Sequence, residues 1–172
     1  GGNVVTLPHN DSMADAISLF VRGRKLPLRT LQETREAIEP VTAYLAAQRR
    51  TDEDLQELKA LHSELIDAVG NFQEFALINI KWHNAVAKAS GNELLAAVLY
   101  SISYGLHVAT TAEEYDTMDT RKEVINIHAR VNEAIEARNP ELAERRMRQH
   151  IGATHARTLA PVTRKIPLST SR

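Results

Sequence analysis

Apolar residues recur at helical spacing along almost the whole chain, and this feature restricts the fold more than any other. Residues three or four apart share one face of a helix, so each run can bury that face against its neighbours. After Asp54, for example, Leu55, Leu58, Leu61 and Leu65 repeat at this spacing. The pattern predicts helices over residues 11–23, 30–49, 52–70, 71–89, 92–113, 119–138 and 140–159.

Residues with strong positional preferences mark several of the expected helix ends. Pro27 separates the first two helices, because proline lacks an amide proton and restricts the residue before it. Thr51 precedes an acidic run and predicts an N-cap. Asn139-Pro140 predicts another N-cap with proline at the first helical position. Pro40 lies inside a helical run and predicts a kink there.

The apolar positions also predict which face of each early helix is turned inward. In the first helix this side is formed by Ala14, Ile17, Leu19 and Phe20. In the second it is formed by Leu31, Ile38, Val41, Leu45 and Ala46.

These elements predict an all-α fold, an antiparallel bundle of six or seven helices. The one β-like run is 3–7, and we expect residues 1–10 to be a linker or the remnant of a preceding domain. Residues 11–160 would form the helical domain. The polar, proline-containing stretch 161–172 is expected to be a flexible tail.

Charge and cysteine content restrict the possible partners. The 21 basic residues are balanced by 22 acidic ones, so this chain is not expected to hold a nucleic acid by itself. No apolar run is long enough for a membrane span, and no signal peptide is recognisable. The chain has no cysteine, which excludes thiolate chemistry and fits a reducing cytoplasm.

Four residues on three expected helices form a candidate metal site. Asn79 and His83 are four apart, which places them about 40° apart around one helix. His128 and His150 lie among apolar positions of two later helices. Buried, unpaired imidazoles are costly, whereas a shared divalent cation satisfies them. His9, His62 and His155 are interpreted as structural or solvated, and His107 as intermediate.

Several motifs resemble the FCD ligand-binding domain of GntR-superfamily transcription regulators, in their FadR-like branch. The resemblance covers about residues 11–160. It is carried by Arg35-x-x-x-Glu39-Pro40 before Leu45-Ala46-Ala47, by Thr51-Asp-Glu-Asp-Leu55, by Asn79-x-x-x-His83 before Ser90-Gly91-Asn92, by His128, and by Met147-Arg148-x-His150.

The resemblance implies a function as a sensor. It implies that residues 1–10 are a linker or the remnant of a preceding winged-helix domain and that residues 11–160 form the effector-binding and dimerisation domain. It also implies a central cavity in the bundle for the metal and the effector. It implies one divalent metal on Asn79, His83, His128 and His150, with zinc as the first candidate and nickel, manganese or iron as alternatives. It also implies a small carboxylate effector, a homodimer, and operator binding through an N-terminal winged-helix domain outside this chain.

Two positions depart from the family pattern. Asn79 stands where aspartate is commonest, and Ile127 replaces a glutamate often found just before the third ligand. Three neutral imidazoles and an amide leave the charge of a divalent cation uncompensated, which favours an anionic effector on the metal.

The resemblance also implies that Arg35 is the second anchor of the effector, because family members often use this arginine against a ligand carboxylate, for which its guanidinium is suited. The alternative for Arg35 is a helix-surface salt bridge to Glu39. Tyr104, His107, Glu114 and Val124 are further candidates for effector contacts.

Two other functions remain open from the sequence. A metalloenzyme would need activated water at the cation. Against it, the sequence neighbours of the expected ligands include no acid as an evident general base: they are Ile80, Lys81, Trp82, Ile127 and Ala129. In a purely structural bundle, the histidines would be incidental.

Overall fold

The structure is a computed structural model that describes residues 10–109 and 117–159. Over these ranges the helices are α1 (Asn10–Gly23), α2 (Leu28–Arg49), α3 (Asp52–Asp67), the 3-10 turn η1 (Ala68–Gly70), α4 (Phe72–Ala89), α5 (Glu93–Ala109), α6 (Met118–Glu136) and α7 (Pro140–Leu159). No strand occurs within these ranges, and the predicted all-α class is confirmed.

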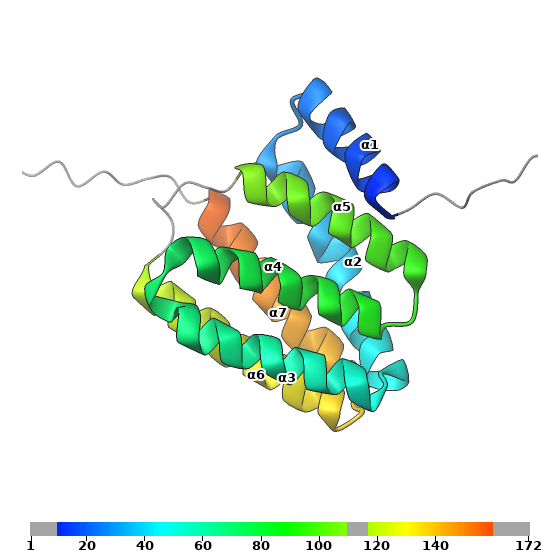
Figure 1. The fold of residues 1–172 in the computed structure, drawn as a ribbon, viewed down its shortest axis with the longest axis vertical. Coiled ribbons are helices and arrows are strands. Elements are labelled where there is room, and N and C mark those ends of the chain that lie inside the picture. Colours follow the sequence, from blue (N-terminus) through cyan, green and yellow to red (C-terminus); the bar gives the residue numbers. More distant parts are fainter. Residues whose placement is uncertain (1–9, 110–116, 160–172) are drawn as a thin grey trace, which may run out of the picture.

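The helices pack side by side into a bundle, and α1 lies at its edge (Figure 1). α2 packs most extensively against α7, while α3 packs against α4 and α6. α6 also packs on α7, and α4 contacts both α2 and α5. α1 packs mainly against α5. α2 contacts α4, α6 and α7, the three helices that carry His83, His128 and His150. None of the described helices is long and apolar enough to cross a membrane.

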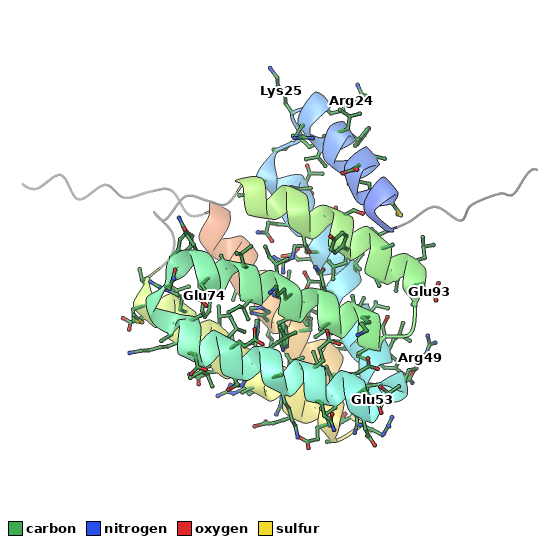
Figure 2. All side chains as sticks on the ribbon, in the orientation of Figure 1. Arg24, Lys25, Arg49, Glu53, Glu74 and Glu93 are labelled. Carbon is green, nitrogen blue, oxygen red and sulfur yellow. The ribbon has the colours of Figure 1, made fainter. Side chains whose placement is uncertain are left out.

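The main hydrophobic core lies between α2, α3, α4, α6 and α7. Its largest fully buried side chains are Trp82, Leu58, Leu65, Ile135, Met147 and Ile151. A smaller cluster of Leu31 and Ile102 joins α2 to α5. Charged side chains labelled in Figure 2, such as Glu53 and Glu93, are exposed at the edges of the bundle. A charged side chain inside it is therefore an exception that calls for an explanation.

The predicted helix caps are present. Thr51 forms a capping box with Asp54, in which each side chain bonds to the other residue's backbone amide. The Asn139 side chain accepts a hydrogen bond from the Leu142 amide, and Pro140 opens α7. α2 starts at Leu28, directly after Pro27, and is helical through Pro40. The kink expected at Pro40 stays a prediction.

The inward face of the first two helices differs from the prediction at three positions. Val41 is 42% exposed, and Leu19 and Phe20 are 68% and 56% exposed. Leu31 and Ala46 are buried as predicted, but the buried face of α2 also contains polar residues, which an apolar pattern cannot identify: Gln32, Arg35, Glu39 and Thr42. α1 packs mainly on one neighbour, so much of its apolar surface stays uncovered.

The predicted domain limits fall largely on residues outside the ranges that the structure describes. Of the expected linker 1–10, only Asn10 is described, as the first residue of α1. The expected tail 161–172 lies outside the described ranges. The extent of the effector-binding domain, 11–160, stays a prediction.

Candidate metal centre

Three histidines from three different helices meet in the interior of the bundle. His83 comes from α4, His128 from α6 and His150 from α7. The Nε2 atom of His150 lies 3.0 Å from that of His128 and 3.3 Å from that of His83. The side chains are 0–3% exposed. The fold therefore brings together the three histidines that the sequence indicated, each with the same ring nitrogen toward the others.

This arrangement is suited to a cation. Burial lowers the pKa of His128 well below its usual range, and the neighbouring His150 and His83 lower it further. Burial also lowers the pKa of His83, although Glu39 partly offsets this effect. Neutral imidazoles offer lone pairs, and facing lone pairs need a proton or a cation between them. Three such nitrogens within 4.8 Å of one another are therefore a suitable donor set for a divalent metal.

Asn79 contributes an unpartnered oxygen one turn before His83 on α4. Its Oδ1 atom is buried and has no hydrogen-bond partner among the described residues. An unpaired buried acceptor is costly, and a cation would satisfy it. The residues present therefore fit a metal. The role of Asn79 as fourth ligand, and the cavity expected around the metal, stay predictions.

Trp82 packs against the cluster from one side, a role that the sequence pattern did not indicate. Its ring stacks on that of His128 with the centroids 3.6 Å apart and the planes 11° from parallel. Its Nε1 atom donates a hydrogen bond of 3.1 Å to Asn132 Oδ1, and Asn132 Nδ2 donates to the Leu58 carbonyl. Trp82 is the only tryptophan of the chain and directly precedes His83. Its position beside a candidate metal ligand is the sequence feature from which a role at the site could have been predicted.

Glu39 lies against the histidine cluster from α2 and is fully buried. Its Oε2 atom is 2.5 Å from His83 Nδ1, and its Oε1 atom accepts a hydrogen bond from Arg35 Nε. Burial would raise the pKa of this carboxyl, but the charge of Arg35 and the contact with His83 lower it to about 2. Glu39 is therefore a carboxylate at neutral pH.

The contact between Glu39 and His83 shows that an acid does lie beside the cluster, although none flanks the histidines in the sequence. The two residues are 44 positions apart. A general base needs access to a substrate or water. Both oxygens of Glu39 are engaged and neither is exposed, so the carboxylate serves His83 and Arg35 instead.

Arg35 forms the ion pair with Glu39 that was the alternative to an effector contact, although the pair is buried and not at the helix surface. The guanidinium is 5% exposed and uses its Nε atom for this bond. Among the described residues no hydrogen bond engages its two terminal nitrogens. These remain available to a carboxylate, and effector binding by Arg35 stays a prediction. One turn earlier, the buried Oε1 atom of Gln32 also has no partner in the described part of the chain.

The remaining predicted site residues are placed only in part. Val124 is half-buried and packs against the main core. Tyr104 and His107 fall within α5, but their side chains lie outside the described part, as does all of Glu114. His62 lies 3.0 Å from the Ile125 carbonyl through its Nε2 atom, as expected for a structural histidine. His9 and the side chain of His155 are outside the described residues.

Comparisons with known proteins agree on one family. The model of the FCD domain matches residues 30–153. The chain is 27% identical over 132 residues to the Glc operon transcriptional activator of Escherichia coli, covering 72% of this chain and 52% of that protein. It is 28% identical over 148 residues to the HTH-type transcriptional regulator LutR of Bacillus subtilis, covering 82% and 66%.

Two solved structures have a similar fold. Streptococcus agalactiae GntR superposes with a TM-score of 0.66 at 25% identity, covering 87% of this chain and 61% of that one. E. coli McbR/YncC has a TM-score of 0.63 at 19% identity, covering 76% and 65%, and supports the fold alone. The chain spans about half to two thirds of the length of these relatives.

Proposed function

The chain belongs to the FCD domain family, and from this premise we propose that it is the metal-dependent sensor domain of a GntR-family transcription regulator. It would bind a small organic acid without chemical turnover. Occupancy would change the DNA affinity of a winged-helix domain elsewhere in the regulator, through a homodimer in the cytoplasm. The named relatives are transcription regulators longer than the part matched, which supports this division of labour.

The observation that carries the proposal is the buried histidine cluster. His83, His128 and His150 would hold one divalent metal, with the Asn79 oxygen as fourth donor. When bound, the metal supplies a positive centre that accepts a carboxylate oxygen. Nitrogen and oxygen donors suit zinc first, with nickel, manganese and iron as alternatives.

The charge balance of the site favours an anionic effector. The three histidines and Asn79 add no negative charge when the imidazoles are neutral, and the charge of Glu39 is offset by Arg35. The charge of a divalent cation would therefore remain uncompensated. The terminal nitrogens of Arg35 provide a second anchor for the same acid. We infer a small carboxylate that bridges the metal and Arg35.

Titration of the protein with nickel and then with acids tests this function. Trp82 stacks on His128, so a bound ion with a partly filled d shell should quench its fluorescence. We expect quenching that saturates at one ion per chain, and a second saturable change with a small carboxylate. Elemental analysis of protein purified without a histidine tag gives the native metal. Absence of saturable metal binding, or turnover of the acid, would contradict the proposal.

Asn79→Asp is expected to tighten metal binding and weaken effector binding. The added negative charge attracts the cation and reduces the positive field that an anionic acid experiences. Calorimetric titration of the parent and the variant with zinc, and then with the acid, measures the two effects. Asn71→Asp is the matched control, because it makes the same change at the exposed N-cap of α4, where aspartate caps equally well. Unchanged or tighter acid binding by Asn79→Asp would refute the charge argument.

A further inference from the structure

Glu39 connects the histidine cluster with the arginine predicted to anchor the effector. It lies on α2, one helical turn after Arg35, and reaches across to His83 on α4. Each carboxylate oxygen has its own partner, and the side chain is completely buried. A buried carboxylate satisfied on both oxygens is held in one orientation, and so are the groups that bond to it.

The contact determines where His83 carries its proton. A neutral imidazole has one N–H, which can be on either ring nitrogen, and a carboxylate can only accept. At 2.5 Å from Glu39 Oε2, Nδ1 of His83 must therefore be the donor. Nε2 then has the free lone pair, and Nε2 is the atom that lies 3.3 Å from His150 Nε2. The proton position and the direction of the ring both suit a metal ligand.

The same carboxylate fixes Arg35 through Nε, the nitrogen nearest the helix. This bond uses one edge of the guanidinium and leaves its terminal nitrogens for another partner. An ion pair that only stabilised α2 would need no contact with His83. The exposed pair of Arg29 and Glu33, at the same spacing on the same helix, has no hydrogen bond to another helix among those of the described residues.

We propose that Glu39 is a positioning residue that holds His83 as the Nδ1–H tautomer for the metal and ties Arg35 to that same imidazole, so that the metal ligands and the effector anchor form one unit. This inference rests on the proposed function. The class of ligand that the unit takes is a carboxylate lying between the cation and Arg35.

The first test uses the metal-free protein and therefore does not depend on metal binding. Long-range proton–nitrogen correlation spectra at neutral pH distinguish the two tautomers of His83. We expect the Nδ1–H form in the parent protein and a mixed or reversed population in Glu39→Gln. Glu33→Gln is the matched control and should leave the His83 spectrum unchanged. The Nε2–H form in the parent, or an unaltered His83 tautomer in Glu39→Gln, would overturn the proposal.

The second test measures the affinity for Zn²⁺ alone. Loss of a carboxylate that orients a metal-bound histidine typically costs about 10- to 100-fold in affinity, so we expect a decrease of at least about tenfold in Glu39→Gln and no change in Glu33→Gln. Affinity within about twofold of the parent would overturn the role of Glu39 toward the metal. If Glu39→Gln does not fold, the tautomer of His83 in the parent still decides whether His83 carries its proton on Nδ1, toward Glu39. If the parent binds no Zn²⁺, the proposed function fails, while the tautomer result still decides whether Glu39 positions His83.

Discussion

A variant in which His83 and His128 are both replaced by alanine should lose its divalent metal. The change removes two of the three imidazoles whose Nε2 atoms meet in the interior, and the remaining oxygen and nitrogen donors are too few to hold a cation tightly. Elemental analysis after dialysis against a trace of metal measures the loss. His62→Ala is the control, because His62 lies outside the cluster and contacts a backbone carbonyl. Full metal occupancy in the double variant would contradict the assignment of the centre.

The same variant should lose the thermal stabilisation that metal gives the parent. A ligand that binds only the folded state and is present at about a hundred times its dissociation constant stabilises that state by about 2.7 kcal/mol. For a domain of this size, that corresponds to roughly 5–10 °C in Tm. Melting curves above neutral pH, with zinc and with a chelator, give the difference for each protein. An equal shift in the parent and the double variant would place the stabilising metal elsewhere.

The fold could be predicted largely from the sequence because most of its determinants are local. Helical spacing of leucines in α3, the cap at Thr51 and the cap with proline at Asn139-Pro140 each act within one or two turns. The interior face of α2 could not be predicted in this way, because it depends on contacts with residues of other helices. Glu39 is buried because His83 and Arg35 satisfy it, whereas Val41 on the same helix is 42% exposed.

The part of the site formed by histidines could be predicted from the sequence. Histidines at apolar helix positions are unusual, and the three that met this criterion do converge. The residues that contact these histidines, Trp82 and Glu39, were harder to identify. Trp82 could have been assigned to the core on its apolar character alone, but its stacking on His128 depends on how α4 packs against α6. The link from Glu39 to His83 joins two helices across 44 positions, and no spacing rule gives such a contact.

Arg35→Ala should weaken binding of the acid at least about tenfold. The guanidinium offers its terminal nitrogens to the acid in a buried setting, where a charge-assisted contact contributes about 1.5–3 kcal/mol. A loss of about 1.4 kcal/mol is a factor of ten. Metal content should remain one ion per chain, because Arg35 does not belong to the histidine cluster that would hold the metal. Calorimetric titration of the metal-loaded protein with a panel of small carboxylates measures the effect.

Two further variants separate the role of Arg35 toward the acid from its role toward Glu39. Arg35→Ala leaves a buried carboxylate without its cation, which can lower stability by itself. Arg35→Lys keeps the charge beside Glu39 but replaces the planar fork by a single ammonium, so it should lose affinity for the acid with a smaller loss of stability. Arg29→Ala removes the arginine of the exposed pair on the same helix and should change neither. If Arg35→Ala, once shown to be folded and metal-loaded, binds the acid as tightly as the parent, then Arg35 serves only Glu39 and the effector has another anchor.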